Sequence, residues 1–328
     1  MFFSLLAGFL FSGLISISAI NPAVKAEVLF FGESSQLRVA VESIDRLPEN
    51  TYKDFYSENF LPENKGLIPW LKDDVPLENF SIYASSALAI DVTSGKVLYS
   101  SGADNVRSIA SLSKLATALT FLDLMPEWGN FYKIKKSDLR SGGKSYIYEG
   151  DEVKIIDLFH LSLMASDNSA TVALGSALGF SEVELAAKMN AKAMALGLVK
   201  THFTDVTGLS YENVSTAKEV AVLAKKSFAR KSIREVVLKR DYSFSTAAGR
   251  VVEVFPTDYL LSVLPQENLD ILGGKTGYTV EAGYCFAGEF FQNNKKIISV
   301  VLGAPTDLAR FQEAKKLAEW VFASFSWK

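Results

Sequence analysis

This 328-residue chain has very little cysteine or histidine, with one Cys and two His. The lone Cys285 cannot form an internal disulfide, and neither His160 nor His202 stands in a spacing that binds zinc. The same scarcity argues against a Ser-His pair or a thiolate nucleophile in hydrolytic chemistry. The chain also lacks a basic block, and its formal net charge is −3. We therefore expect no metal site and no nucleic-acid partner.

A phosphate-binding loop is missing as well, although the stretch LGGKTGYT at residues 272–279 contains Gly-Lys-Thr. Such a loop requires a glycine five residues before Gly274. Leu269 occupies that position, and the surrounding ENLDILGG lacks the glycines that would curl around phosphates. The sequence therefore argues against a nucleotide hydrolase of this class.

Residues 1–26 form an apolar run whose first charged residue is Lys25. Val24 and Ala26 have the small side chains that a signal peptidase reads, but the positively charged start of a signal peptide is missing. The run is also close to the length of a membrane-spanning helix. We expect an exported protein that works outside the cytoplasm, with residues 1–26 as a cleaved signal peptide or a retained membrane anchor.

Residues 27–80 contain eleven acidic and five basic residues, and four prolines interrupt them. This composition predicts a linker or an irregular extension, followed by one domain over residues 81–328. Within that domain, apolar stretches at 87–92 and 97–99 flank a turn containing Gly95 and predict a strand hairpin.

Helical spacing of apolar residues predicts further elements downstream of the hairpin. Three apolar stretches near the C-terminus predict successive strands, and a final helix is expected to turn Leu308, Phe311, Leu317, Val321 and Phe325 inward. Strands at both ends with helices between them predict an α+β domain with one antiparallel sheet. The predicted helices are 112–122, 154–166, 181–197, 215–229 and 306–325, and the predicted strands are 271–279, 283–291 and 295–304.

The pattern Ser-x-x-Lys occurs three times in the chain. One copy, at 141–144, lies in a glycine-rich loop without a helix to hold it, and another, at 215–218, opens a predicted surface helix where a Ser or Thr is most simply an N-cap. The third copy, Ser111 and Lys114, opens a strongly apolar helix. A Lys three residues after a Ser lies one turn above it on the same helix face. Burial and a nearby second cation would lower the pKa of Lys114 and make it a usable base.

Two further motifs carry polar side chains suited to catalysis. Ser166 and Asn168 flank Asp167 at a corner between two helices, where Asp167 is expected to be a turn or cap carboxylate. The only Lys-Thr-Gly of the chain lies on a predicted strand, at 275–277. A lysine and a threonine can present a cation and a hydroxyl to an anionic group, and Gly277 leaves space for a backbone at the strand edge.

The order Ser-x-x-Lys, Ser-x-Asn, Lys-Thr-Gly is a signature of class A β-lactamases and penicillin-binding proteins. With stretches such as IDVTSGKVLYS, LMASDNSATVAL and GGKTGYTVEAGYC, residues 85–325 resemble the serine D-alanyl-D-alanine carboxypeptidases, the low-molecular-mass penicillin-binding proteins. The resemblance implies a β-lactamase/DD-peptidase-like α+β fold. Its five-stranded antiparallel sheet would be flanked by helices, with the active site between the sheet and a helical region.

The resemblance also implies roles for the motif residues. Ser111 would attack the carbonyl between two D-alanines of a peptidoglycan stem peptide, Lys114 would take its proton, and Ser166 would relay a proton to the leaving amine. Asn168 would hold the substrate amide. The Lys-Thr-Gly strand would bind the terminal carboxylate through Lys275 and Thr276, beside Gly277, and the N–H groups of Ser111 and Tyr278 would form the oxyanion hole. The chemistry needs no cofactor, and β-lactam antibiotics would acylate the same serine.

Other activities share this signature. Ser-Asp-Asn is the β-lactamase form of the middle motif, but the Glu-x-x-Leu-Asn motif that β-lactamases use for deacylation is missing between Asn168 and Lys275. A D,D-endopeptidase that cuts crosslinks and a silent penicillin-binding module remain as alternatives. The family often ends in a C-terminal membrane helix, whereas this sequence stops at Lys328 after the closing helix. We therefore expect contact with the bacterial membrane through the N-terminal segment.

Overall fold

The computed structural model describes residues 15–16, 27–28, 68–73, 75, 80–261 and 269–327. The chain divides into two units, residues 1–56 and 57–328. In the first unit, the described residues form β1 (Ile15–Ser16) and β2 (Glu27–Val28), which pair antiparallel. The rest of the predicted leader and most of the acidic extension lie outside the described residues. Among the residues described, no helix is both long and apolar enough to cross a membrane.

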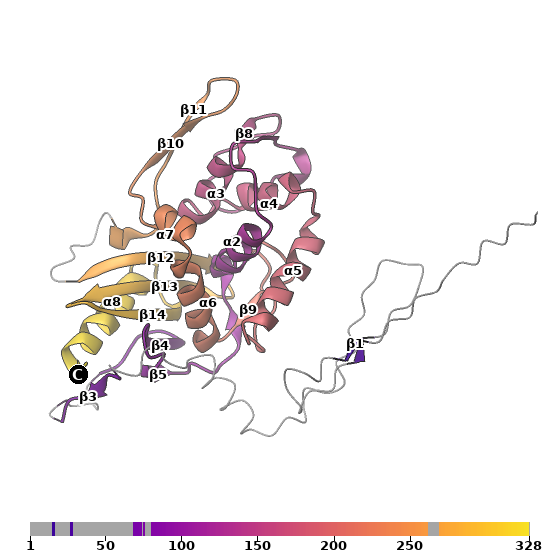
Figure 1. The fold of residues 1–328 in the computed structure, drawn as a ribbon. Coiled ribbons are helices and arrows are strands. Elements are labelled where there is room, and N and C mark those ends of the chain that lie inside the picture. The colour runs from indigo at the N-terminus through magenta and orange to yellow at the C-terminus, as the bar shows by residue number, and fades with distance from the viewer. Residues whose placement is uncertain are drawn as a thin grey trace, which may run out of the picture. The chain divides into compact units, whose positions relative to one another are not determined.

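A five-stranded antiparallel sheet forms the centre of the second unit (Figure 1). Its strands are β4 (Ser86–Asp91), β5 (Val97–Ser101), β12 (Asp270–Thr279), β13 (Gly283–Gln292) and β14 (Lys295–Ala304), in the order β12-β13-β14-β4-β5. Asn293 and Asn294, both with positive φ, form the tight turn between β13 and β14. The pairing of β14 with β4 confirms that the N-terminal hairpin joins the three C-terminal strands in one sheet.

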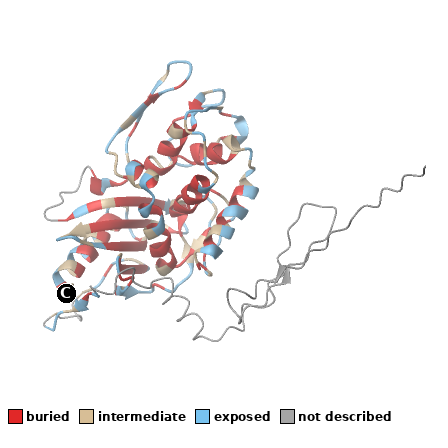
Figure 2. Cartoon of the chain, in the orientation of Figure 1, coloured by how far each residue is buried: buried red, intermediate tan, exposed pale blue. Residues whose placement is uncertain are grey.

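The two faces of the sheet belong to two separate hydrophobic clusters because strand side chains alternate. Leu88 and Ile90 of β4 pack toward the helical region, whereas Ala87 and Ala89 face the opposite side. Helix α6 (Ala217–Ala229) contacts β4, β13 and β14 on the first face, and helix α8 (Asp307–Ser324) covers the second. Burial is concentrated in the sheet and in the helices against it (Figure 2). This finding corrects the expectation that α6 is a surface helix.

The helical region lies beside the β12 edge of the sheet (Figure 1). The predicted helices form, whereas helix α7, the β10–β11 hairpin and the bounds of α4, which follows the Ser166 corner, were not predicted. In α6 the cap is Thr216, whose side chain accepts from the Glu219 N–H, in agreement with the expected Ser or Thr cap. The elements are η3 (Ala110–Leu112), α2 (Ser113–Asp123), η4 (Lys136–Asp138), α3 (Ile155–Met164), α4 (Asn168–Ala177), α5 (Glu182–Ala195), α7 (Lys231–Val237) and η5 (Tyr259–Leu261), with the small pairs β6 (Arg107–Ser108) and β9 (Val214–Ser215), β7 (Phe131–Lys133) and β8 (Glu152–Lys154), and β10 (Tyr242–Ser245) and β11 (Val251–Val254).

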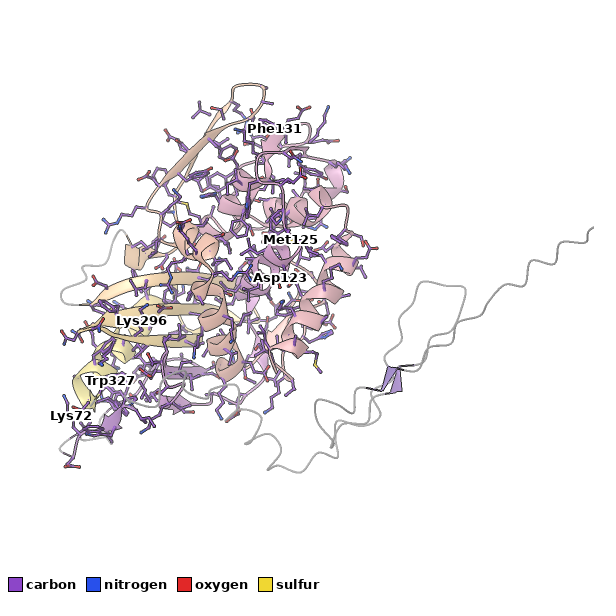
Figure 3. The ribbon with its side chains drawn as sticks, in the orientation of Figure 1. Lys72, Asp123, Met125, Phe131, Lys296 and Trp327 are labelled. Atoms are coloured by element: carbon purple, nitrogen blue, oxygen red, sulfur yellow. The ribbon has the colours of Figure 1, made fainter. Side chains whose placement is uncertain are left out.

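The described end of the acidic extension packs on α8 and on the far end of the sheet. Strand β3 (Trp70–Leu71) pairs with β15 (Phe325–Ser326), and the Lys96 ammonium donates to the Pro69 carbonyl. Phe80 stacks on Trp320 with ring centroids 4.4 Å apart. Figure 3 labels Lys72 and Trp327 in this area. These residues lie at the end of the sheet opposite the Lys-Thr-Gly motif, so this described part of the extension leaves the motif uncovered.

The burial of α8 corrects one expectation about its inward face. Phe311, Leu317 and Val321 are fully buried as expected, and Phe325 is buried beyond the helix end, but Leu308 is 45% exposed. At 100° per residue, Leu308 lies about 120° from the centre of the buried stripe. Spacing from Phe311 alone suggested a shared face, whereas the whole stripe shows that Leu308 points toward solvent.

We expect Leu317→Ala to lower the free energy of unfolding by about 2–5 kcal/mol, because it leaves a cavity between α8 and the sheet. Leu308→Ala removes the same atoms from an exposed position and is expected to change stability by no more than about 0.5 kcal/mol. Urea denaturation of both variants measures the difference. Equal losses in the two variants would contradict the buried stripe described for α8.

Candidate active site

Ser111 lies in the short helix η3, directly before α2. The preceding Ala110 has a φ of +47°, a left-handed conformation that is costly for a residue with a side chain. The Ser113 hydroxyl donates to the Ala110 carbonyl over 2.8 Å and holds this turn. A β-carbon on Gly208 would lie 2.0 Å from the same carbonyl, so the 208 backbone packs directly on the turn. The turn leaves Ser111 partly exposed at the start of a buried helix.

Lys114 is fully buried one turn after Ser111, as the spacing predicted. Its Nζ is hydrogen-bonded to Ser111 Oγ at 2.8 Å, to Asn168 Oδ1 at 2.7 Å and to the Thr207 carbonyl at 2.7 Å. Burial lowers the pKa of Lys114 from 10.5 to about 7, against the opposing charges of Asp205 and Asp167. About half of the Lys114 amines are therefore neutral near pH 7.

The three partners of Lys114 define what its neutral form can do. A neutral amine has two N–H donors and one lone pair, and an amide oxygen or a carbonyl can only accept. The two N–H groups therefore go to Asn168 Oδ1 and the Thr207 carbonyl. The lone pair is left facing Ser111 Oγ, which is the arrangement required to accept the serine proton.

Ser166 and Lys275 form the second polar pair of the site. Ser166 has a φ of +59° between α3 and α4, and its Oγ accepts from Lys275 Nζ over 2.8 Å. Lys275 also donates to the Thr276 carbonyl over 3.0 Å. Desolvation, followed by the nearby charges of Lys114 and Arg310, lowers the pKa of the buried Lys275 well below its usual value. Two buried amines thus lie at the corner between the helices and the sheet.

The Ser-Asp-Asn corner is held by Asp167, which caps α4 as the sequence suggested. Its side chain accepts from the backbone N–H groups of Ala170, at 2.8 Å, and Tyr146, at 3.1 Å. Asn168 begins α4 and donates from Nδ2 to the Gly142 carbonyl over 3.0 Å. Asn168 therefore joins Lys114 to the glycine-rich loop that carries Gly142.

Strand β12 brings the Lys-Thr-Gly motif against the turn at Ala110 and Ser111, which we call the nucleophile turn because Ser111 is the candidate nucleophile. A β-carbon on Gly277 would lie 2.9 Å from the Ile109 carbonyl and 3.1 Å from the Ser111 nitrogen. Since β12 is an edge strand of the five-stranded sheet, its side away from β13 pairs with no other strand of that sheet beside this contact. Thr276 Oγ1 is 2.6 Å from Thr257 Oγ1, and Tyr278 is exposed at the motif's end with its ring stacked on Tyr284.

The other two Ser-x-x-Lys copies have different environments. Lys144 is exposed, with its Nζ 4.6 Å from the centre of the Tyr146 ring. Lys218 forms an ion pair with Asp104 at 2.7 Å. Only the 111–114 copy buries its lysine against its own serine. Within the described residues, no group of three or more His, Cys, Asp or Glu could hold a metal ion.

Several residues at the site were not anticipated from the sequence. Thr207 supplies a backbone carbonyl, which carries no side-chain signature, and Asp205 was assigned no role from the sequence. Thr257 meets Thr276 from a segment distant in sequence. Arg310 of α8 donates to the Gly277 carbonyl over 3.0 Å and fixes the end of the motif. Gly208 has a positive φ, a conformation that glycine adopts more readily than other residues.

Comparison with known proteins agrees with this geometry. Residues 73–306 match the family described as D-alanyl-D-alanine carboxypeptidase. The D-alanyl-D-alanine carboxypeptidase DacF of Bacillus subtilis is 30% identical over 252 residues, which are 74% of this chain and 63% of that protein. The D-alanyl-D-alanine endopeptidase of Escherichia coli is 32% identical over 243 residues, which are 73% of this chain and 77% of that protein.

Solved structures are similar over the same part of the chain. A Streptomyces DD-transpeptidase superposes with a TM-score of 0.69 and 26% identity, covering 74% of this chain and 98% of that one. An evolved penicillin-binding protein homologue from Mycobacterium tuberculosis superposes with a TM-score of 0.70 and 25% identity, covering 77% and 95%. These similarities confirm the DD-peptidase-like α+β fold.

The contact between Gly277 and the nucleophile turn generates a prediction. We expect Gly277→Ala to lower the free energy of unfolding by about 1–3 kcal/mol, because its β-carbon would meet two backbone groups. Gly129 has nothing within 4 Å of an added β-carbon, so Gly129→Ala is the matched control and should change stability by about 0.5 kcal/mol or less. Chemical denaturation compares them, and an unaffected Gly277→Ala protein would refute the close contact.

Proposed function

The chain belongs to the D-alanyl-D-alanine carboxypeptidase family of serine peptidases, and from this premise we propose that it removes the terminal D-alanine from peptidoglycan stem peptides. The observation that carries the proposal is the 2.8 Å hydrogen bond between the buried Lys114 amine and Ser111 Oγ. A lysine that is half neutral near pH 7 can take the proton of a serine without a histidine.

In the first step, neutral Lys114 accepts the Ser111 proton while Ser111 Oγ attacks the carbonyl between the two D-alanines. The negative charge that develops on the carbonyl oxygen is stabilised by the N–H groups of Ser111 and Tyr278. Gly277 supports this proposal, because an added β-carbon there would lie 3.1 Å from the Ser111 nitrogen. Each such donor is worth roughly 3 kcal/mol of transition-state stabilisation.

The leaving D-alanine needs a proton on its amine when the C–N bond breaks. We assign this transfer to Ser166, which gives its hydroxyl proton to the amine and recovers one from protonated Lys114. The hydrogen bond from Lys275 orients the Ser166 hydroxyl. Water then hydrolyses the ester on Ser111, which regenerates the enzyme. In a β-lactam the ring carbonyl takes the place of the peptide carbonyl, so the same serine is acylated.

Lys275 and Thr276 are proposed to bind the terminal carboxylate of the substrate. Lys275 is desolvated and repelled by neighbouring cations in the free protein. A carboxylate beside it would raise its pKa and favour its charged form. Thr276 Oγ1, now 2.6 Å from Thr257 Oγ1, supplies a hydroxyl at the same place. Asn168, already beside Lys114, is proposed to hold the substrate amide.

A D,D-endopeptidase is the second candidate, because the similar proteins include endopeptidases as well as carboxypeptidases. The two activities share the acylation step and differ in what the cleft accepts on the leaving side. We also propose that the protein acts outside the cytoplasm, with the apolar residues 1–26 as a signal peptide or a membrane anchor. Support comes from that apolar run and from the location of peptidoglycan outside the membrane.

We expect the full chain to form a stable adduct with a fluorescent penicillin, seen by intact-protein mass, and to release D-alanine from a peptide ending in D-Ala-D-Ala. Ser111→Ala should lose the adduct and reduce D-alanine release by roughly a thousandfold or more, because the nucleophile is gone. Ser141→Ala, in the exposed copy of the motif, is the matched control and should retain both.

Each other outcome identifies an alternative. Cleavage of a cross-linked stem-peptide dimer without release of terminal D-alanine would assign the endopeptidase. Rapid turnover of the penicillin would indicate a β-lactamase. A wild-type protein with no adduct, no D-alanine release and no crosslink cleavage would be a silent cell-wall module and would contradict the proposal.

The lowered pKa of Lys114 predicts how acylation depends on pH. Only the neutral amine accepts the serine proton, and its fraction rises through a pKa of about 7. The rate of acylation by penicillin should therefore rise about tenfold per pH unit below pH 6 and level off above about pH 8. Stopped-flow measurement between about pH 5 and 10 tests this. A rate that still climbs steeply near pH 10 would indicate an ordinary lysine and count against Lys114 as the base.

A further inference from the structure

The loop at residues 204–213 packs against α2 beside Lys114, and none of its residues was assigned a role in the site from the sequence. Two of its successive carbonyls accept hydrogen bonds from α2. The Val206 carbonyl accepts from Thr117 Oγ1 over 2.6 Å, and the Thr207 carbonyl accepts from Lys114 Nζ over 2.7 Å. Because residues 114 and 117 lie one turn apart on the same helix face, the loop is fastened along α2 beside the base.

Asp205 holds this loop in its shape. Its Oδ1 accepts from the Thr207 N–H at 2.5 Å, the Thr207 hydroxyl at 2.7 Å and the Gly208 N–H at 2.7 Å. Its Oδ2 accepts from the Ser210 N–H at 2.7 Å. Four donors thus converge on one carboxylate, and hydrogen bonds to an ionised acceptor are roughly twice as strong as neutral ones.

A single peptide group connects Asp205 to Lys114. The Gly208 N–H and the Thr207 carbonyl belong to the same trans peptide, in which they point in opposite directions. The N–H side faces the Asp205 carboxylate and the carbonyl side faces the Lys114 amine. The carboxylate therefore both orients the carbonyl and polarises it toward the amine.

Asn213 fixes the other side of the loop. Its Nδ2 donates to the Asp205 carbonyl over 2.9 Å and to Ser113 Oγ over 3.1 Å, beside the nucleophile. Gly208 has a φ of +85°, and its backbone packs on the Ala110 carbonyl. The loop is thus attached both to the nucleophile turn and to the helix that carries the base.

We propose that Asp205 is a positioning residue for this reaction: through the Thr207–Gly208 peptide it orients Lys114 Nζ toward Ser111 Oγ, and its negative charge favours the protonated form of Lys114. The inference rests on the proposed role of Lys114 as the base. The other charged groups that act on Lys114 are Asp167, at the start of α4, and Lys275, on β12. The charges of two carboxylates, Asp205 and Asp167, raise the pKa of Lys114 and so oppose the effect of its burial. The effect of Asp205 is the larger of the two.

Asp205→Asn tests the proposal with nearly the same shape. The amide keeps the oxygen that faces Thr207 and Gly208, but it loses the charge and the bond from Ser210. The midpoint of the acylation–pH profile should move to lower pH by roughly 0.5–1 unit. The maximal rate should fall about tenfold, because the carbonyl is held less firmly.

The control is Asp138→Asn. Asp138 is also buried, and it accepts from Tyr132, Lys135 and Ser176 outside the site. This variant should lose stability without any shift of the midpoint. A purely structural Asp205 would behave like Asp138, so an unchanged midpoint in folded Asp205→Asn protein would overturn the proposal.

Titration of the Lys114 amine by NMR with isotope-labelled lysine separates this proposal from the proposed function. The signal is assigned by its loss in Lys114→Arg, and its midpoint should also move to lower pH in Asp205→Asn. If the wild type forms no penicillin adduct, the proposed function fails, while this titration still tests the coupling. A Lys114 midpoint that is the same with and without the Asp205 charge would refute the inference on its own.

Discussion

The arrangement of the site depends on the burial of the Lys114 amine, which would be unfavourable without hydrogen-bond partners. Burial disfavours the ammonium ion, and the surrounding carbonyl and amide oxygens satisfy the N–H groups that remain. Since those oxygens can only accept, the lone pair of the neutral amine is directed to Ser111 Oγ. In the proposed mechanism, a lysine and two acceptors take the place of the histidine that other serine peptidases use.

The fold buries this amine away from solvent and holds its orientation. Two backbones, at Gly208 and Gly277, approach the nucleophile turn so closely that a β-carbon on either would collide with it. Two residues with side chains, Ala110 and Ser166, are held at positive φ, the first directly before Ser111 and the second beside Lys275. Such conformations cost of order 1–3 kcal/mol each and persist where the surrounding structure enforces them. The strain at Ala110 and Ser166 and the close contacts of Gly208 and Gly277 lie where the proposed chemistry occurs.

Much of this arrangement was predictable from the sequence, and the parts that were not have physical reasons. Strand alternation and helical spacing identified the hairpin, the C-terminal strands and most helices, because those segments bury one clear face. Helix α4 is rich in small residues, so its apolar period is faint, and the exposure of Leu308 depends on the whole buried stripe of α8. The motif residues meet as their order implied. Asp205 and the Thr207 carbonyl were assigned no role, because a backbone acceptor has no side-chain signature and Asp205 contacts Lys114 only through a backbone peptide.

The central claim, that Ser111 is the nucleophile beside a buried base, is tested most directly by locating the acyl group in the wild-type protein. Trypsin would cut after Arg107 and Lys114, which places Ser108, Ser111 and Ser113 on one short peptide. After reaction with penicillin at about pH 8, where Lys114 is mostly neutral, fragmentation of this peptide by mass spectrometry should place the added mass on Ser111. Added mass on Ser113, on Ser166 or on a serine of the other two motif copies would contradict the account.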